Sequence, residues 1–209
     1  DLPFLICFLQ INFFLIFSIV LLRNILFNGL YTAARLIPCL LLRNGGLVKT
    51  RQFMDEKYVG DPINAVRIFN EKEADELIVL DIDASIKQTG PDFNLIAKLA
   101  SECRMPLCYG GGVTTVDQMS RLVDMGVEKV AVSSSIISKP SLIKDMSDAV
   151  GSQSVVAVLD LNTRKGLFSS GYDLWSHNAK VKYEVDYLSL IKDIQEMGAG
   201  EIVINSILY

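Results

Sequence analysis

The residues best suited to chemistry lie in the stretch MPLCYGGGVTTVDQ, from Met105 to Gln118. A short apolar run of strand length ends there in three consecutive glycines, and a helix start follows directly. Glycine adopts φ values closed to other residues, so the backbone N–H groups of this turn can face outward together. Thr115 and Gln118 have the spacing of a capping box, which directs the positive end of the helix at the same spot. The stretch predicts a phosphate site, and the alternative is an ordinary tight turn between a strand and a helix.

The composition argues against several other chemistries. Half of the 209 residues are hydrophobic and the formal net charge is −4, so the chain can build a large core but has no basic excess for nucleic acid. His177 is the only histidine, so neither a Ser/His/Asp triad nor a histidine metal cluster can be assembled. The four cysteines form no CxxC pair and lie in apolar runs, which predicts buried thiols in a reducing compartment, the cytoplasm. We expect no metal and no cofactor.

A strongly apolar segment at residues 2–22 differs from the rest of the chain. It is long enough to cross the hydrocarbon core of a bilayer, which is about 30 Å thick. The chain starts at Asp1 rather than methionine, and an α/β pattern begins abruptly at Arg35, which favours a non-native extension over a genuine membrane helix. We therefore divide the chain into an apolar extension at 1–34 and a barrel domain at 35–209. Membrane association is expected only if the segment is a genuine anchor.

From Arg35 onward, apolar runs of strand length alternate with helical stretches. The runs are nearly continuous, which predicts parallel strands that are buried on both faces. Repeated strand–helix units with right-handed crossovers point to a (β/α)8 barrel or a doubly wound sheet. The six expected strands are Leu36–Leu42, Leu77–Ile82, Pro106–Tyr109, Val130–Val132, Val155–Leu161 and Ile202–Ile207, and the clearest helices are expected near 61–74, 92–103, 115–125, 140–150 and 186–197.

A weak internal repeat favours the barrel. The run after Glu76 resembles the run after Glu201, and the run after Arg35 can be laid over Val155–Leu161, as in a duplicated half-barrel. Glycines and alternating residues within 162–183 predict a hairpin inserted after the fifth strand. Six strands are two βα units short of a barrel of typically about 250 residues. We therefore expect an incomplete (β/α)8 TIM-type barrel, with unpaired and aggregation-prone edges at its first and sixth strands.

Six motifs within residues 35–207 together resemble one protein family. In order, they are RLIPCLLLRNGGLVKT, DELIVLDIDAS, CYGGGV, GVEKVAVSSS, GSQSVVAVLD and GAGEIVINSI. They are similar to the cyclase subunit of imidazole glycerol phosphate synthase, a lyase of histidine biosynthesis. The resemblance implies a barrel that forms a heterodimer with a class I glutaminase. The barrel would receive ammonia from that partner and close the imidazole ring on a small molecule that carries two phosphates.

The resemblance also assigns binding residues. The first phosphate site of the family matches Gly111 and Gly112 here, and the end of the following strand offers Ser133 and Ser134, whose hydroxyl and N–H groups bind phosphate oxygens. Lys49, expected in the loop after the first strand, matches a family lysine near the substrate and would neutralise developing negative charge. Its alternative is a solvated surface lysine.

The family's chemistry rests on two aspartates at the ends of strands one and five, where one donates a proton and the other accepts one. Asp160 occupies the strand-five position, whereas Leu41, which cannot ionise, stands at the strand-one position. Asp81 also matches a family aspartate near the site. For the nearby Asp83 we expect loop-orienting hydrogen bonds instead.

Four charged residues are expected at the opposite end of the barrel, because each sits at the start of an apolar strand: Arg35, Glu76, Lys129 and Glu201. By resemblance they form the ring that gates ammonia entry. The alternative is a salt-bridge cluster that only covers the barrel bottom, and in either case the four charges must be kept together because an unpaired buried charge is costly.

Three functions remain open at this point. The first is the histidine-pathway cyclase. The second is a paralogous branch that supplies ammonia for amidination of a surface sugar, whose members resemble this chain in CLLLRNGG and PLCYGGG. The third is a non-catalytic subunit that conducts ammonia or acts as a scaffold. That role would need Arg35, Glu76, Lys129 and Glu201, but not Asp160.

Overall fold

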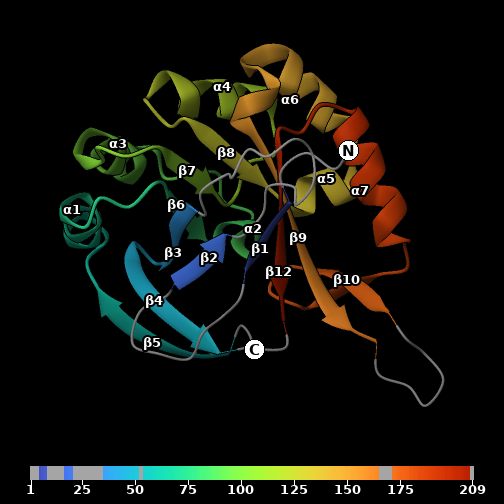
Figure 1. The fold of residues 1–209 in the computed structure, drawn as a ribbon, viewed down its shortest axis with the longest axis horizontal. Coiled ribbons are helices and arrows are strands. Elements are labelled where there is room, and N and C mark those ends of the chain that lie inside the picture. Colours follow the sequence, from blue (N-terminus) through green and yellow to red (C-terminus); the bar gives the residue numbers. More distant parts are fainter. Residues whose placement is uncertain (1–4, 9–16, 21–34, 52–53, 165–170, 208–209) are drawn as a thin grey trace, which may run out of the picture.

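The computed structural model describes residues 5–8, 17–20, 35–51, 54–164 and 171–207 (Figure 1). Six strands of the described part run parallel, each hydrogen-bonded to the next in chain order, which confirms the strand prediction and the α/β class. Short apolar runs with both faces buried favour this arrangement. The six strands are β3 (Arg35–Arg43), β6 (Leu77–Asp81), β7 (Leu107–Gly110), β8 (Lys129–Val132), β9 (Val155–Thr163) and β12 (Glu201–Ser206).

Helices connect these strands and pack on the outer side of the sheet (Figure 1). Side chains at the N-caps accept backbone N–H groups of the first turn, and at Thr115 the complete capping box with Gln118 is present. All five expected helices are found: α1 (Pro62–Glu71), α3 (Phe93–Glu102), α4 (Val116–Asp124), α6 (Leu142–Val150) and α7 (Tyr187–Glu196). Three shorter pieces join them: α2 (Ala84–Lys87), α5 (Ser134–Ser138) and the single 3₁₀ turn Ser152–Ser154.

Two apolar clusters lie on the two faces of the parallel strands. The larger cluster joins the outer strand faces to the helices and includes Leu99, Leu122 and Ile194. Alternate residues of the same strands build a smaller inner cluster, because successive strand side chains point to opposite faces. The inner cluster consists of Ile37, Cys39, Ile78, Cys108, Ala131, Val156, Val158 and Val203, with Leu41 and Leu80 packed against it. The inside of the barrel is therefore lined by apolar side chains.

The described part of the apolar N-terminal segment consists of two strands. β1 (Leu5–Phe8) pairs in parallel with β12, and β2 (Phe17–Val20) pairs antiparallel with β3. β1 and β2 also contact each other, so these strands lie between the first and sixth strands of the parallel series (Figure 1). The expectation of unpaired edges at those two strands is therefore wrong. Where residues 2–22 are described they are strands rather than a helix, and among the described residues no helix is long and apolar enough to span a membrane.

Two hairpins extend from the ends of the parallel strands. The predicted one follows β9 and consists of β10 (Tyr172–Ser176) and β11 (Val181–Tyr183); residues 165–170 of the predicted region lie outside the described residues. The other, β4 (Gly46–Arg51) with β5 (Met54–Gly60), was not predicted. Asn44 and Gly45 both have positive φ in the two-residue turn between β3 and β4, and an Asn-Gly pair at such a turn is the sequence signal that was missed.

Candidate functional site

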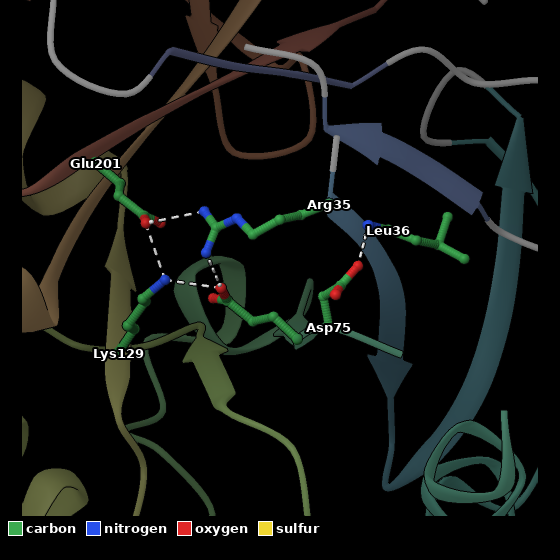
Figure 2. A network of polar contacts seen from close by, with 6 residues as sticks. Arg35, Leu36, Asp75, Lys129 and Glu201 are labelled. Atoms are coloured by element: carbon green, nitrogen blue, oxygen red, sulfur yellow. Dashed lines mark hydrogen bonds and ion pairs between the residues drawn. The ribbon is translucent and has the colours of Figure 1, made fainter. Parts of the chain in front are cut away.

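Four charged side chains meet at the end of the barrel where the parallel strands begin, here called the lower rim (Figure 2). Lys129 Nζ lies 2.7 Å from Glu76 Oε2 and 2.9 Å from Glu201 Oε1. The guanidinium of Arg35 reaches the same two carboxylate oxygens at 3.4 Å each. Cations and anions therefore alternate around a closed ring. Arg35, Lys129 and Glu201 are the first residues of their strands, and Glu76 directly precedes β6. Strand alternation turns all four side chains inward, so they meet at this end of the barrel.

The ring is deeply buried on one side and open on the other. The side chain of Glu76 is 2 % exposed, whereas that of Arg35 is 41 % exposed. Burial raises the pKa of Glu76, and the hydrogen bond from Lys129 opposes that rise. For Lys129, burial lowers the pKa, but hydrogen bonds to Glu76 and Glu201 outweigh it and leave the pKa raised. Lys129 is thus the firmly held cation, while Arg35 covers the ring from the solvent side. Beside it, Asp75 accepts the N–H of Leu36 at 2.7 Å and fixes the start of β3 (Figure 2).

The glycine turn lies at the opposite end, where the parallel strands finish, here called the upper rim. Gly111 and Gly112 have φ values of +122° and +70°, which side-chain-bearing residues rarely adopt. A Cβ at Gly111 would collide with the carbonyl oxygen of Asp81, and one at Gly112 with that of Thr89. The turn therefore packs backbone against backbone. It leads into α4, whose N-terminal N–H groups are those suited to an anion.

The two serines assigned to phosphate lie one strand further along the sheet. Ser133 directly follows β8 and precedes α5, and its side chain makes no capping hydrogen bond to that helix. Ser134 is the first residue of α5. Because β7 and β8 are parallel neighbours with Gly110 opposite Ala131, the glycine turn and Ser133 emerge side by side at the upper rim. The arrangement offers backbone and hydroxyl donors to a phosphate.

Asp160 projects inward near the end of β9, in line with Val156 and Val158 of the inner cluster. Its Oδ1 accepts a hydrogen bond of 2.8 Å from Nδ2 of Asn205, which stands opposite it on β12. Burial raises the pKa of Asp160 to about 6, and the hydrogen bond from Asn205 limits the rise. The group is therefore poised to exchange a proton near neutral pH.

Leu41 and Leu80 occupy the inward positions of β3 and β6 at the same height, paired with each other in the strand register. Both pack against the inner cluster, so this side of the upper rim is apolar. Among the inward positions described at this height, Asp160 is the carboxyl group. Its pKa is raised by burial and not by a second acid.

Of the remaining assigned residues, Lys49 differs from the expectation in position, and Asp81 and Asp83 differ in their contacts. Lys49 is in strand β4 and exposed, opposite Lys57 of β5, so its expected place in a loop is wrong. Asp81 ends β6 and its Oδ1 accepts the N–H groups of Asp83 and Ala84, at 3.0 and 3.1 Å. This is the loop-orienting role that we had expected of its neighbour. Asp83 instead pairs with Arg43 and Lys87, at 2.8 Å each.

Three polar residues at the upper rim were missed in the sequence: Asn162, Trp175 and Asn205. Asn205 bonds to Asp160, and the side-chain Oδ1 of Asn162 and Nε1 of Trp175 are buried without a hydrogen-bond partner in the part of the chain that the structure describes. The signal for the asparagines was the alternation of the strands. Asn162 lies two residues after Asp160, and Asn205 lies four residues after Glu201, each on the same inward face. For Trp175 no signal existed before its pairing with β9 was known.

Parallel strands with outer helices and an apolar interior define a barrel of the (β/α) type. The family model described as histidine biosynthesis protein matches residues 35–208, and the chain belongs to that family. It is 54 % identical over 173 residues to a putative imidazole glycerol phosphate synthase subunit of Leptospira borgpetersenii, covering 83 % of this chain and 67 % of the relative. A relative with the same description from Vibrio vulnificus is 53 % identical over 174 residues, covering 83 % and 66 %.

An imidazole glycerol phosphate synthase subunit of Natranaerobius thermophilus is 36 % identical over 175 residues, covering 84 % of this chain and 68 % of the relative. The chain thus spans about two thirds of the length of the relatives it matches. Its similarity to the two relatives described as putative is higher than to this one.

Proposed function

We propose that this chain is the cyclase-type subunit of an imidazole glycerol phosphate synthase, receiving ammonia from a class I glutaminase and acting in the cytoplasm on a phosphorylated small molecule. The observation that carries the proposal is the arrangement of the two rims. The closed ring of Arg35, Glu76, Lys129 and Glu201 lies at one end, and Asp160 with the glycine turn lies at the other. The inner cluster between them is apolar, which suits passage of neutral ammonia and excludes ammonium.

Asp160 is the residue that we assign to proton transfer. With a pKa of about 6 it holds a proton in part of the molecules near neutral pH and can give it up or take it back. Gly111, Gly112, Ser133 and Ser134 would hold one phosphate of the substrate. Asp81 would act through the loop that it orients, and the exposed side chain of Lys49 on β4 would neutralise negative charge on the substrate.

Leu41 weakens the cyclase activity in this proposal. A carboxyl group on the opposite side of the reacting centre contributes about 10²–10⁴-fold to the rate, and leucine offers no titratable group in its place. Phosphate binding and ammonia passage need no carboxyl group at position 41. We infer that the natural protein is a poor cyclase whose main role is to receive and deliver ammonia.

The test is ammonia-dependent imidazole formation by the complete natural protein, before and after Leu41→Asp. We expect low turnover in the parent, a gain of about 10²–10⁴-fold in Leu41→Asp, and loss of that gain on adding Asp160→Asn. Leu41→Asn is the matched control, because the asparagine side chain is as small and polar as that of aspartate but cannot ionise near neutral pH. Robust turnover with Leu41 in place would overturn the inference and make the protein an ordinary cyclase.

A second candidate is the paralogous branch in which the barrel supplies ammonia for amidination of a surface sugar. Leu41 favours it, because delivery of ammonia does not require the acid/base pair of ring closure. A third, a non-catalytic ammonia-conducting scaffold, would keep the lower-rim ring but would not depend on Asp160. Nucleic acid has no place in any of them, given the net charge of −4.

Partnership is tested separately from chemistry. We expect a co-expressed class I glutaminase to purify with the complete protein as a heterodimer and to hydrolyse glutamine faster than alone. Arg35→Glu, which reverses the charge at the open side of the ring, should reduce that activation. If the wild-type protein neither retains the glutaminase nor raises its activity, the ammonia-receiving role is wrong for all three candidates.

A further inference from the structure

Strand β10 pairs with the C-terminal half of β9 and extends the sheet at the upper rim (Figure 1), and Asp160 lies within this ladder. Trp175 stands directly opposite Asp160 in this antiparallel ladder, and Asn162 stands opposite Asp173. Residues opposite each other in a ladder share one face, and residues two apart on one strand share it too. Asp160, Asn162, Asp173 and Trp175 therefore form one surface, which we call the hairpin face. It adjoins the proton-transfer residue without being part of the glycine turn.

Two polar atoms on the hairpin face are buried and lack a hydrogen-bond partner within the described residues: Nε1 of Trp175 and Oδ1 of Asn162. Their parent side chains are only partly buried, so the face as a whole remains accessible. A buried polar group without a partner costs about 1–3 kcal/mol, and such groups are rare in folded proteins. One of the two is a donor and the other an acceptor. A ligand group that both accepts and donates a hydrogen bond would satisfy the pair.

The charges nearby indicate that this ligand group is neutral. Arg164 and Lys182, the two cations on the same side of the hairpin, both pair with Asp173, at 2.9 Å each. These pairs lower the pKa of Asp173 and keep it ionised. Among the described residues of the hairpin face no cation is left over for a phosphate. Phosphate recognition is assigned instead to the glycine turn and Ser133.

We propose that Trp175 and Asn162 are specificity-determining residues that bind a neutral hydroxyl or amide group of the substrate, next to Asp160. The indole N–H donates to this group and the Asn162 carbonyl oxygen accepts from it. The inference rests on the proposed function, because it takes the upper rim as the substrate site. The inference adds a contact that recognises the uncharged part of a phosphorylated substrate.

The chain provides its own reporter for this contact, because Trp175 is its only tryptophan. The first experiment titrates the 209-residue chain with ribose 5-phosphate, which joins one phosphate to neutral hydroxyl groups, and follows tryptophan emission. Inorganic phosphate is the second probe, with its binding measured by calorimetry. We expect ribose 5-phosphate to change the emission and inorganic phosphate to bind without changing it.

Three variants then separate recognition from folding. Asn162→Leu removes the side-chain amide and Trp175→Phe removes the indole N–H. We expect ribose 5-phosphate to bind each variant about 5- to 10-fold more weakly by calorimetry, with inorganic phosphate unaffected. Tyr183→Phe is the matched control. It removes a hydroxyl group that accepts from Ser176 at 3.2 Å within the same hairpin, and it should leave both affinities unchanged.

The outcomes distinguish this inference from the proposed function. One outcome is that inorganic phosphate binds, while ribose 5-phosphate does not change the emission and binds no more tightly than inorganic phosphate. The hairpin face is then not a recognition surface, and only this inference is overturned. Equal weakening in Tyr183→Phe would assign the effect to hairpin folding and would also overturn it. If neither probe binds, the upper rim is not a phosphate-substrate site, and both the inference and the proposed function are wrong.

Discussion

The two rims of the barrel differ in how their polar groups are satisfied. At the lower rim, four charges alternate in a closed ring, and each has two partners of opposite sign within 3.4 Å. Among the residues that the structure describes, Asp160 at the upper rim has one amide partner, and two buried polar atoms nearby have none. A buried group that is fully paired contributes to a fixed structure, whereas one without a partner is costly unless a ligand completes it. The lower rim is therefore complete in the free protein, whereas the upper rim keeps unpaired polar groups among the described residues, as expected for the substrate site proposed above.

The largest effect on stability should come from removing the buried carboxylate of the ring, Glu76. Glu76→Leu leaves two cations facing one carboxylate, and we expect a loss of about 3–5 kcal/mol in the free energy of unfolding, measured with urea. The double variant Glu76→Leu/Lys129→Leu, which restores the charge balance, should recover most of that loss. In the control Asp148→Ala, which breaks the exposed pair with Lys144, we expect no measurable change. If Glu76→Leu alone changed the free energy of unfolding only slightly, the remaining charges of the ring would be solvated rather than buried.

The next effect concerns the glycine turn of the upper rim. Gly111→Ala forces a side chain to φ +122° and against the carbonyl oxygen of Asp81, so we expect a loss of about 2–4 kcal/mol and of phosphate binding. Gly45→Ala is the matched control, since Gly45 also has positive φ (+76°) but open space around it. It should cost about 1 kcal/mol and leave phosphate binding intact. Equal losses in both variants would contradict a special role for the close backbone packing at Gly111.

Asp160 should make the protein less stable as pH rises, whereas an ion-paired acid makes a protein more stable as pH rises. Its pKa is about 6 in the folded protein against an ordinary value of 3.8, so the folded state holds the proton more tightly. Stability then falls as pH rises from about 4 to about 6 and remains lower above. We expect Asp160→Asn to be more stable than the parent by about 3 kcal/mol at pH 8, with the difference vanishing towards pH 4. Urea unfolding at both pH values checks this, and a less stable variant at pH 8 would refute it.

The smallest effect on stability should come from replacing Arg35, which lies on the solvent side of the ring. Arg35 is 41 % exposed and holds its two carboxylates at 3.4 Å, longer than the contacts of Lys129. We expect Arg35→Met to change the free energy of unfolding by less than about 1 kcal/mol. Lys129→Met should cost several times more. If the two variants were equally destabilised, Arg35 would be as firmly held as Lys129, and the contrast drawn between the two cations would be wrong.

Local sequence was sufficient for most of the elements. The six continuous apolar runs became the six parallel strands, since such runs can only be buried on both faces. The Asp-Pro pair at Asp61 and the capping box at Thr115 set their helix starts through contacts that span three residues. The turn from β3 into β4 also had a local signal, the Asn-Gly pair at Asn44 and Gly45. Strands β4 and β5 were missed because they lack the continuous apolar run that marked the others.

Tertiary structure alone decided the site around Asp160. Asn205 lies 45 residues away in the chain and reaches Asp160 only because β9 and β12 pair in one register out of several possible ones. Likewise, the unpartnered indole of Trp175 follows from the pairing of β10 with β9 and from the burial around it. The sequence by itself determined which residues face inward along each strand, because that alternation is local. Which of them meet, and how far burial raises the pKa of Asp160, depends on contacts between strands that no local pattern encodes.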